Sequence, residues 1–351
     1  MIRTLPDTML AVKKLADAPG LDWSPEATVP ELPTGHVLIA VTHAGICGTD
    51  RHIFEWNSWA QSVIKPPLIF GHEFSGEVVE KGKNVSTLKE GDTVAVESHV
   101  PCQTCPQCTN GTMHICDHLQ IFGVDRPGCF AEYVSVPAIC AWKVPNSMPP
   151  EIASIMEPMG NAVHAVSAGE VEGQTVVVMG CGPTGLFATA VAKAEEAAKV
   201  IAVDINPKRL EMADSMGADE LLDGADPHLI KKIFGETSLG GVDVVLEMSG
   251  SSRAMINGLR CLKKGGTLIS FGLPDKPVEL DLANDVILPG RKIIGVVGRL
   301  MFETWEEMQR LLDSGKLDPA PIVTHKYSLA EWETAFDTLK SGEAGKVVLF
   351  P

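Results

Sequence analysis

Residues 175–204 read TVVVMGCGPTGLFATAVAKAEEAAKVIAVD, and this stretch decides the fold. The opening run to Met179 is apolar, which is typical of a strand buried on both faces. Gly180, Gly182 and Gly185 then form a G-x-G-x-x-G pattern at the expected start of a helix. A second apolar run ends at Asp204, nineteen residues after Gly185. Strand, glycine turn, helix and strand in this order predict a βαβ unit of a parallel sheet.

The glycine turn predicts a dinucleotide site. Glycines let the backbone approach a pyrophosphate, whose charge then lies at a helix N-terminus. Asp204 stands where an acid accepts hydrogen bonds from the adenosine ribose, and its charge repels a 2′-phosphate, so NAD is favoured over NADP. Arg209 opposes this preference because a nearby arginine can accommodate that phosphate. A chance glycine-rich turn in an α/β domain is the alternative.

The rest of the chain divides into two patterns. Strand and helix signals continue after Asp204, with a helix from 207, a strand at 242–248, a helix ending near 262, and strands at 267–272 and 292–297. Residues 36–157 instead show short alternating runs between Gly, Pro and Asn, which predict a mostly-β domain. A helix over 301–314, another from 329 and a strand at 346–350 close the chain. The predicted fold class is therefore α/β with a separate mostly-β domain.

Composition excludes several classes of protein. Apolar residues make up 45% and charged residues 21%, as in globular proteins rather than disordered chains, collagens or coiled coils. With 29 Lys and Arg against 45 Asp and Glu, the net charge is −16, so nucleic acid and anionic membrane surfaces are not expected partners. No apolar run reaches the roughly 18 residues that cross a bilayer. The N-terminus lacks the apolar core of a secretory signal, and we expect a cytoplasmic protein.

Four cysteines within fifteen residues indicate a metal site. Cys102, Cys105, Cys108 and Cys116 have the spacing C-x2-C-x2-C-x7-C, in a lobe of about residues 100–117. Four thiolates can close a tetrahedral shell around zinc, and a closed shell is structural rather than catalytic. The alternatives are an iron–sulfur cluster, whose known spacings differ, and four ordinary buried cysteines.

Three separate segments contain further candidate ligands: Cys47 in CGTDRH, His72 and Glu73 in GHE, and Glu157 in MEPMGNAVH. A thiolate, an imidazole and a carboxylate could hold zinc with an open fourth position. No spacing rule joins these segments, so residues that only pack, or a Glu157 that only caps its helix, are equally good interpretations. The residues by themselves thus indicate a zinc-bearing, dinucleotide-binding α/β protein, and an oxidoreductase is the simplest such protein.

A family resemblance goes further. GHEFSGEVVEKG (71–82), the four-cysteine lobe and the glycine turn followed by Asp204 together resemble the zinc-dependent medium-chain alcohol dehydrogenases over nearly the whole chain. Within that superfamily the L-threonine 3-dehydrogenases are the most similar branch, through CGTDRHIFEWNSWAQ (47–61), PGCFAEY (127–133), EPMGNAVH (157–164), LEMSG (246–250) and GRLMFETW (298–305). The resemblance implies a GroES-like catalytic domain over 1–157, a doubly wound Rossmann domain over 158–299 and a C-terminal return to the first domain over 300–351.

The resemblance also implies roles for single residues. Cys47, His72 and Glu73 would surround a catalytic zinc, with Glu157 in or beside that shell. Thr49 and His52 would relay the substrate's hydroxyl proton to solvent. The implied cofactor contacts are Gly180, Gly182, Thr184, Gly185, Asp204, Arg209, Phe271, Gly272, Leu273, Val296 and Val297.

Three residues need separate comment. Arg299 is a candidate partner for a substrate carboxylate, and His99 is a candidate lining residue. The alternative for Arg299 is an ion pair at the surface or between subunits. The alternative for His99 is a solvated position in a loop. Relatives usually have glycine after the first lobe cysteine, where this chain has Gln103, and a non-glycine residue could alter that turn.

The implied reaction is NAD-dependent oxidation of L-threonine at its β-carbon to L-2-amino-3-oxobutanoate. A catalytic zinc would act as Lewis acid on the hydroxyl and a second zinc would be structural, giving two per chain. The resemblance also implies a homotetramer, for which the strand at 292–297 could pair across a symmetry axis. A polyol dehydrogenase for sorbitol or 2,3-butanediol and, more remotely, a non-catalytic NAD-binding interaction protein are the alternatives.

Overall fold

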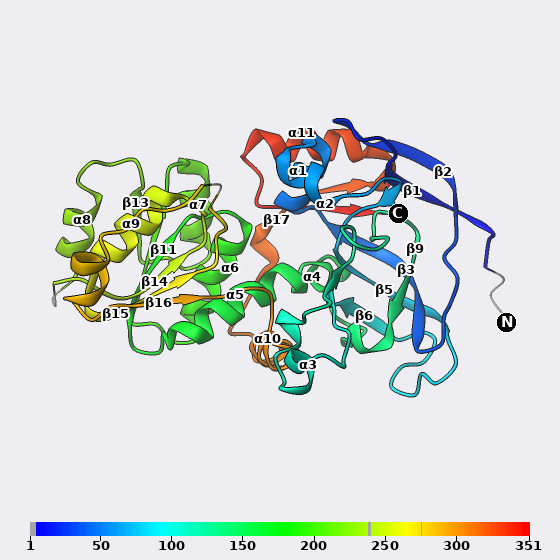
Figure 1. Cartoon of the computed structure of the whole chain (residues 1–351), viewed down its shortest axis with the longest axis horizontal. Coiled ribbons are helices and arrows are strands. Elements are labelled where there is room, and N and C mark those ends of the chain that lie inside the picture. Colours follow the sequence, from blue (N-terminus) through cyan, green and yellow to red (C-terminus); the bar gives the residue numbers. More distant parts are fainter. Residues whose placement is uncertain (1–4, 238–239, 275) are drawn as a thin grey trace. The chain divides into compact units, whose positions relative to one another are not determined.

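The computed structural model describes residues 5–237, 240–274 and 276–351, and the chain forms two compact units. The first unit contains Met1–Glu157 and Val323–Pro351, and the second contains Pro158–Ile322. Figure 1 shows the segments near both chain ends, coloured blue and red, within the first unit. This arrangement confirms the predicted class, a mostly-β domain together with an α/β domain.

The first unit is built mainly of antiparallel strands. Its largest sheet has the order β10-β6-β5-β3-β18-β17, with β9 also paired to β3. These strands are β3 (His36–Gly45), β5 (Glu73–Lys81), β6 (Thr93–Val96), β9 (Tyr133–Pro137), β10 (Ala141–Lys143), β17 (Val323–Ser328) and β18 (Lys346–Phe350). The smaller sheets contain β1 (Thr8–Lys14), β2 (Asp22–Thr28) and β4 (Leu68–Ile69), and β7 (His99–Val100) with β8 (Gln120–Ile121). The predicted closing strand thus pairs beside β3, near the start of the chain.

Short helices connect these strands: α1 (Gly48–Glu55), α2 (Ser58–Val63), α3 (Pro106–Thr109), α4 (Pro150–Ser154) and α11 (Trp332–Ser341). The 3-10 turns are Met113–Ile115, Ala138–Cys140 and Leu329–Glu331. Aromatic side chains fill the core between sheet and helices. Phe70 packs edge-on against Phe130, and Phe336 of α11 stacks on Phe54 of α1.

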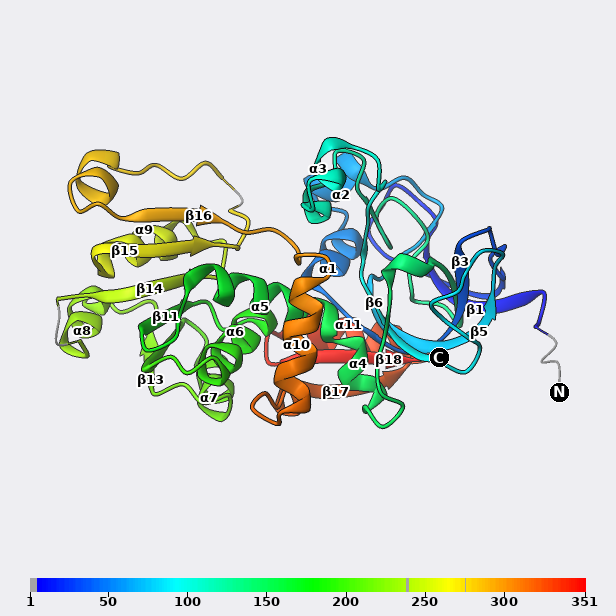
Figure 2. The same cartoon turned by 90° about the horizontal axis from the view of Figure 1, so that it is seen from below.

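The second unit contains a parallel sheet with the order β13-β12-β11-β14-β15-β16. Its strands are β11 (Thr175–Met179), β12 (Lys199–Asp204), β13 (Glu220–Asp223), β14 (Val242–Glu247), β15 (Leu262–Ser270) and β16 (Lys292–Gly295), and Figure 2 shows β14, β15 and β16 in succession. Its helices are α5 (Met156–Gly169), α6 (Pro183–Ala194), α7 (Pro207–Ser215), α8 (Leu229–Gly235), α9 (Ser252–Cys261), the π-helix Leu282–Ile287, α10 (Glu303–Asp313) and the 3-10 turn Ala320–Ile322. Helices α6 and α7 contact each other and the strands β11, β12 and β13, whereas α8 contacts α9, which packs on β14 and β15. Because the strand order also reverses at β11, the arrangement is doubly wound.

Helix α10 shows where the second unit ends. The family resemblance implied a return to the first domain at residue 300, but α10 and the following turn belong to the second unit. The reason is burial: Trp305, Met308 and Leu311, spaced three residues apart on one face of α10, are completely covered. The chain returns to the first unit only at Val323.

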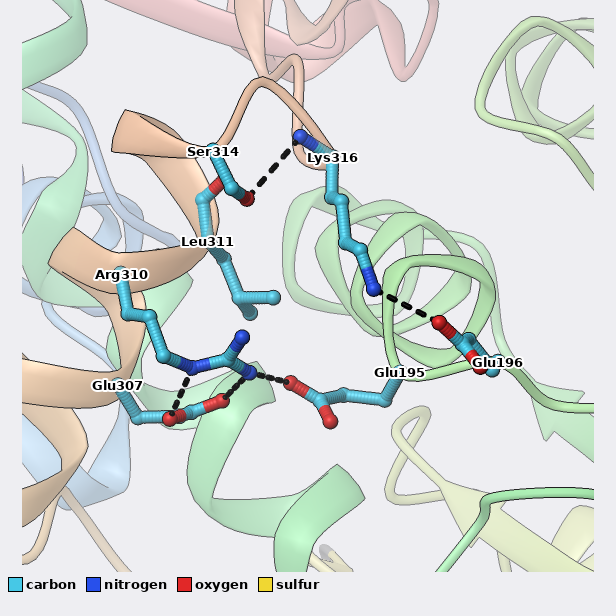
Figure 3. A network of polar contacts seen from close by, with 7 residues as sticks. All are labelled: Glu195, Glu196, Glu307, Arg310, Leu311, Ser314 and Lys316. Atoms are coloured by element: carbon cyan, nitrogen blue, oxygen red, sulfur yellow. Dashed lines mark hydrogen bonds and ion pairs between the residues drawn. The ribbon is translucent and has the colours of Figure 1, made fainter.

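Charged side chains hold the end of α10 against α6 (Figure 3). Arg310 donates to Glu195 at 2.9 Å and to Glu307 within its own helix, and Lys316 donates to Glu196 at 2.7 Å. The Arg310 guanidinium therefore forms ion pairs with two carboxylates. Burial and the neighbouring Glu307 raise the pKa of Glu195 to about 7.

None of the helices in the described part of the chain combines the length and the apolar character that crossing a membrane requires.

Candidate functional site

The four lobe cysteines lie together between β7 and β8. The Cys102 and Cys108 sulfurs are 4.0 Å apart, and those of Cys105 and Cys116 are 3.7 Å apart. Zn–S bonds of about 2.3 Å at tetrahedral angles separate sulfurs by about 3.8 Å, so the four positions fit one zinc ion. Backbone N–H groups of Cys102 and His118 donate to the Cys116 sulfur at 3.3 Å.

The turn after the first lobe cysteine has an unusual backbone. Gln103 has φ of 62°, in the left-handed region that glycine adopts without strain. This conformation lets the Cys105 N–H donate to the Cys102 sulfur at 3.3 Å. Hydrogen bonds from the Thr104 backbone and side chain and from the Cys105 N–H lower the pKa of Cys102 to about 5, which favours the thiolate that a metal requires.

The dispersed candidates also come together. Cys47 lies two residues beyond the end of β3, and His72 and Glu73 stand at the start of β5. Because β3 and β5 are antiparallel neighbours with Gly45 opposite Glu73, the three side chains meet at one end of the pair. Their ligand atoms all lie within 4.8 Å of one another. His72 Nδ1 is buried, makes no hydrogen bond among the described residues and faces a carboxylate at 3.8 Å, an arrangement that orients the ring of a metal ligand. Thiolate, imidazole and carboxylate suit zinc.

Glu157 lies outside this group of three donors. It stands in the first turn of α5 and is buried, with Oε1 accepting a hydrogen bond from the Ser98 hydroxyl at 2.6 Å. Its charge acts on His72, so a second carboxylate is available near the metal ligands, held by a neighbour from the loop after β6.

Two buried partners of the ligands were not predicted from the sequence. Asp50 accepts from the Cys47 N–H at 2.8 Å and has its other oxygen 3.8 Å from His72 Nδ1. Burial raises the pKa of Asp50 to about 6, although His72 opposes that shift. Lys346 donates to Glu73 at 2.6 Å, 273 residues away in sequence. Asp50 could have been found from its place in CGTD, whereas no local signal points to Lys346.

The proposed relay residues differ in their surroundings. Thr49 lies in the first turn of α1, with its hydroxyl 3.8 Å from the Cys47 sulfur. His52 is exposed on the same helix, with Nδ1 3.0 Å from the Asn57 amide and its ring edge-on to Trp59. Thr49 thus lies beside the metal ligands and His52 faces solvent, which is the order that a proton relay from substrate to solvent needs. The relay itself stays a prediction.

The glycine turn has the shape that pyrophosphate requires. Gly180 has φ of 95°, and Gly182 is the N-cap of α6. A Cβ on Gly185 would lie 1.8 Å from the Gly180 carbonyl oxygen, so only glycine lets the helix start this close to the strand. Thr184 lies in the first turn of α6 and is partly exposed. The free N–H groups at this helix start can bind an anion.

Asp204 ends β12 beside that turn. Its carboxylate accepts from the N–H groups of Cys181 at 2.7 Å and Asn206 at 2.8 Å, which fixes its position next to the turn. Arg209 lies 4.0 Å from the same carboxylate. Ile205, 75% exposed directly after Asp204, adds an apolar surface of the kind a purine ring covers.

Glu247 is a further buried carboxylate that the sequence analysis did not single out. It ends β14, is completely buried, and accepts from the N–H groups of Ser249 at 2.9 Å and Gly250 at 3.1 Å. Its carbonyl accepts from the N–H groups of Phe271 and Gly272, both at 3.0 Å. Burial raises the pKa of Glu247, against the hydrogen bonds that favour its charge. Glu247 therefore joins two loops at the carboxyl edge of the sheet.

The other predicted residues occupy varied environments. Leu273 is 91% exposed, Val296 is buried and Val297 is exposed, so the expected cofactor contacts include both covered and open positions. His99 is half-buried in β7. Arg299 is fully buried and donates to Asn161 of α5 at 2.8 Å, rather than standing at the surface. Contact of His99 or Arg299 with substrate stays a prediction.

Comparison with known proteins agrees with both units. Residues 33–146 match the alcohol dehydrogenase GroES-like domain, and residues 183–314 match the zinc-binding dehydrogenase domain. An L-threonine 3-dehydrogenase of Bacillus licheniformis is 45% identical over 98% of this chain and 99% of its own length, and one of Bacillus subtilis is 46% identical over 93% and 94%. The solved structure of 2R,3R-butanediol dehydrogenase from Bacillus subtilis covers 98% of this chain with a TM-score of 0.88 at 27% identity.

The chain combines a GroES-like unit that carries a Cys-His-Glu donor group with a Rossmann unit that carries an acid at the end of its second strand. This combination defines a zinc-dependent medium-chain dehydrogenase. Within this class, the chain belongs to the L-threonine 3-dehydrogenase family.

Proposed function

We propose that this protein oxidises L-threonine at its β-carbon to L-2-amino-3-oxobutanoate, with NAD as hydride acceptor. The single observation that carries the proposal is the convergence of Cys47, His72 and Glu73 within 4.8 Å, in a chain 45% identical to an L-threonine 3-dehydrogenase over nearly its full length. When bound, zinc supplies Lewis acidity toward the substrate hydroxyl, and NAD accepts the hydride.

The chain's own residues supply position and proton transfer. Cys47, His72 and Glu73 would surround the catalytic zinc, with Glu157 in or beside that shell, and the four lobe cysteines would hold the structural one. Thr49 would accept the hydroxyl proton and pass it to His52 at the surface, since a hydroxyl can accept one proton while it donates another. The turn from Gly180 would bind the pyrophosphate of NAD.

A polyol dehydrogenase is the second candidate. The specific observation in its favour is the fold similarity to a 2R,3R-butanediol dehydrogenase, at 27% identity. The relatives named L-threonine 3-dehydrogenase are much closer in sequence, so threonine is preferred. A non-catalytic NAD-binding protein would not need a three-ligand site that leaves zinc a free position.

A substrate panel tests the proposal. The purified protein would be assayed with L-threonine, sorbitol and 2,3-butanediol, each with NAD and with NADP. We expect kcat/KM to be highest for threonine with NAD. A kcat/KM for either diol comparable to that for threonine would contradict the proposed substrate.

We also propose a homotetramer, built partly through the sheet edge at β16. Every residue of β16 is exposed, and it is the last strand of its sheet. The strand and the sequence on either side of it contain exposed apolar side chains: Leu282, Ile287, Leu288, Ile293, Ile294 and Val297. An uncovered apolar edge strand is a template for pairing with another chain. Sedimentation that found a stable monomer at micromolar concentration would exclude this assembly.

The remaining proposals concern location and partners. A cytoplasmic location fits the nine cysteines, all of them free of disulfides, because a reducing compartment keeps thiolates available to zinc. The net charge of −16 argues against binding to nucleic acid or to anionic membranes.

A further inference from the structure

The candidate catalytic site contains more ligands than an open zinc site needs. Cys47, His72 and Glu73 form the group of three donors, and Glu157 is a buried carboxylate held beside it by Ser98. Four protein ligands would close a tetrahedral shell, and a closed shell leaves no position for a substrate hydroxyl. If the site is catalytic, some feature of the chain must restrain one of its carboxylates.

Lys346 is placed to restrain Glu73. Its side chain is 2% exposed, and its ammonium donates to Glu73 Oε1 at 2.6 Å and also contacts Oε2. Glu73 is itself completely buried. Both carboxylate oxygens thus face a cation supplied by the opposite end of the chain. An ammonium that occupies both oxygens reduces the charge they can donate to a metal.

The sheet is built to accommodate this ion pair. Strand β3 runs between β5, which begins with Glu73, and β18, which begins with Lys346. The two side chains meet over Gly45, the last residue of β3. A Cβ on Gly45 would lie 2.2 Å from Glu73 Oε2 and 3.0 Å from Lys346 Cε. The glycine therefore provides the space in which the pair forms, two residues before Cys47.

We propose that Lys346 is a positioning residue of the catalytic metal site, which keeps Glu73 from becoming a permanent fourth zinc ligand. The inference rests on the proposed function in so far as the site holds a catalytic zinc. With Glu73 paired to Lys346, zinc keeps an exchangeable position for the substrate hydroxyl. Without the lysine, the buried carboxylate would lose this cation and would turn to the metal.

The first experiment replaces Lys346 by methionine, which keeps the length of the side chain and removes its charge. Zinc affinity is measured by competition with a chromophoric chelator, and the coordination of cobalt in place of zinc is followed by visible absorption. We expect Lys346→Met to bind zinc about tenfold more tightly, to shift the cobalt spectrum and to lower kcat. Lys346→Arg, which keeps a cation, should restore all three properties in part.

The matched control is Lys14→Met. Lys14 is the other lysine that is almost completely buried among the described residues, and its ammonium donates to the Gly20 carbonyl at 2.7 Å, away from the metal ligands. Its loss should reduce thermal stability without changing zinc affinity or the cobalt spectrum. If Lys346→Met behaves like Lys14→Met, with lower stability and unaltered metal binding, the proposal is wrong.

A comparison in the Glu73→Gln background covers the case in which Lys346→Met does not fold. The double variant Glu73→Gln/Lys346→Met removes both members of the buried pair and leaves no uncompensated charge, and it is compared with Glu73→Gln, which keeps the Lys346 ammonium. We expect these two proteins to differ little in zinc affinity, because Lys346 acts through Glu73. A tightening of zinc binding of about tenfold on adding Lys346→Met to Glu73→Gln would overturn the proposal. These metal measurements do not depend on which alcohol is oxidised, so failure of the proposed substrate would be recognised separately.

Discussion

Replacing Gln103 by glycine should stabilise the four-cysteine lobe. Gln103 has φ of 62°, and its neighbours Cys102 and Cys105 both contribute sulfur to the cluster. The left-handed conformation brings the Cβ of an L-residue too close to the following carbonyl oxygen, whereas glycine has no Cβ. The side chain of Gln103 is exposed, so its removal uncovers no core.

The size of the effect follows from two opposing terms. The left-handed conformation costs a non-glycine residue about 1–2 kcal/mol. Glycine gains conformational freedom in the unfolded chain, which offsets about 0.4–1 kcal/mol of that benefit. The net stabilisation is therefore about 1 kcal/mol, or about fivefold in an equilibrium constant. Because a closed thiolate site folds together with its metal, this gain should appear as tighter zinc binding.

The assay follows the more slowly released zinc, which belongs to the closed site, with a chromophoric chelator under mild denaturant. Gln103→Gly should bind that zinc about fivefold more tightly than the parent protein. Gln103→Ala is the control, since it removes the same side chain but retains the Cβ, and it should bind zinc about as the parent does. Equal behaviour of the glycine and alanine variants would refute the argument from backbone strain.

Brief treatment with a chelator should abolish activity before the protein unfolds, and added zinc should restore turnover. The reason is that the three-ligand site exchanges its metal more readily than the closed four-cysteine cluster. A single tightly bound zinc in fully active enzyme would contradict the assignment of two zinc sites. Thr49→Ala and His52→Asn should each lower kcat while both zinc ions remain bound, and near-native kcat between about pH 6 and 9 in either variant would remove that residue from the relay. Glu247→Gln should raise KM for NAD about tenfold and leave KM for threonine nearly unchanged, because the substitution disturbs two loops at the carboxyl edge of the sheet. Parallel increases in the KM for NAD and the KM for threonine would instead indicate a general structural role. Burial and Glu307 raise the pKa of Glu195 to about 7. The folded protein then retains a proton that the unfolded chain releases, so the free energy of unfolding should fall as pH rises from about 4.5 to 7. Urea unfolding at pH 5 and pH 8 should show a smaller decrease for Glu195→Gln, and an unchanged decrease would assign it to other groups.

Several features could be predicted because neighbouring residues encode them. The strands at 175–179 and 199–204 and the closing strand at 346–350 were expected from apolar runs and are present. The strand Glu220–Asp223 was not expected, because its four residues alternate between half-buried and exposed and show no continuous apolar run. Helix α10 was expected, but the unit to which it belongs was predicted wrongly. An amphipathic pattern shows which face of a helix is buried, but it does not show which part of the protein covers that face.

The candidate site likewise contains some features that neighbouring residues encode and others that depend on how distant strands pair. The lobe cysteines and the glycine turn with Asp204 each fall within a short segment, and their spacing alone indicates zinc and a dinucleotide. Cys47 and His72 are 25 positions apart, and no spacing rule joins them. The family resemblance brought them together in the prediction, whereas in the structure the pairing of β3 with β5 does so.

By itself the sequence determined the class of fold, the metal-binding chemistry of the four-cysteine lobe and the preference for NAD, because hydrophobic period and short ligand spacing act between near neighbours. The tertiary structure alone decided that Lys346 lies against Glu73 over Gly45, that Asp50 faces His72, and that the chain leaves its second unit at Ile322. The Lys346–Glu73 contact depends on which strands become neighbours in a sheet. Strand order is set by the burial of the whole core rather than by any local run of residues.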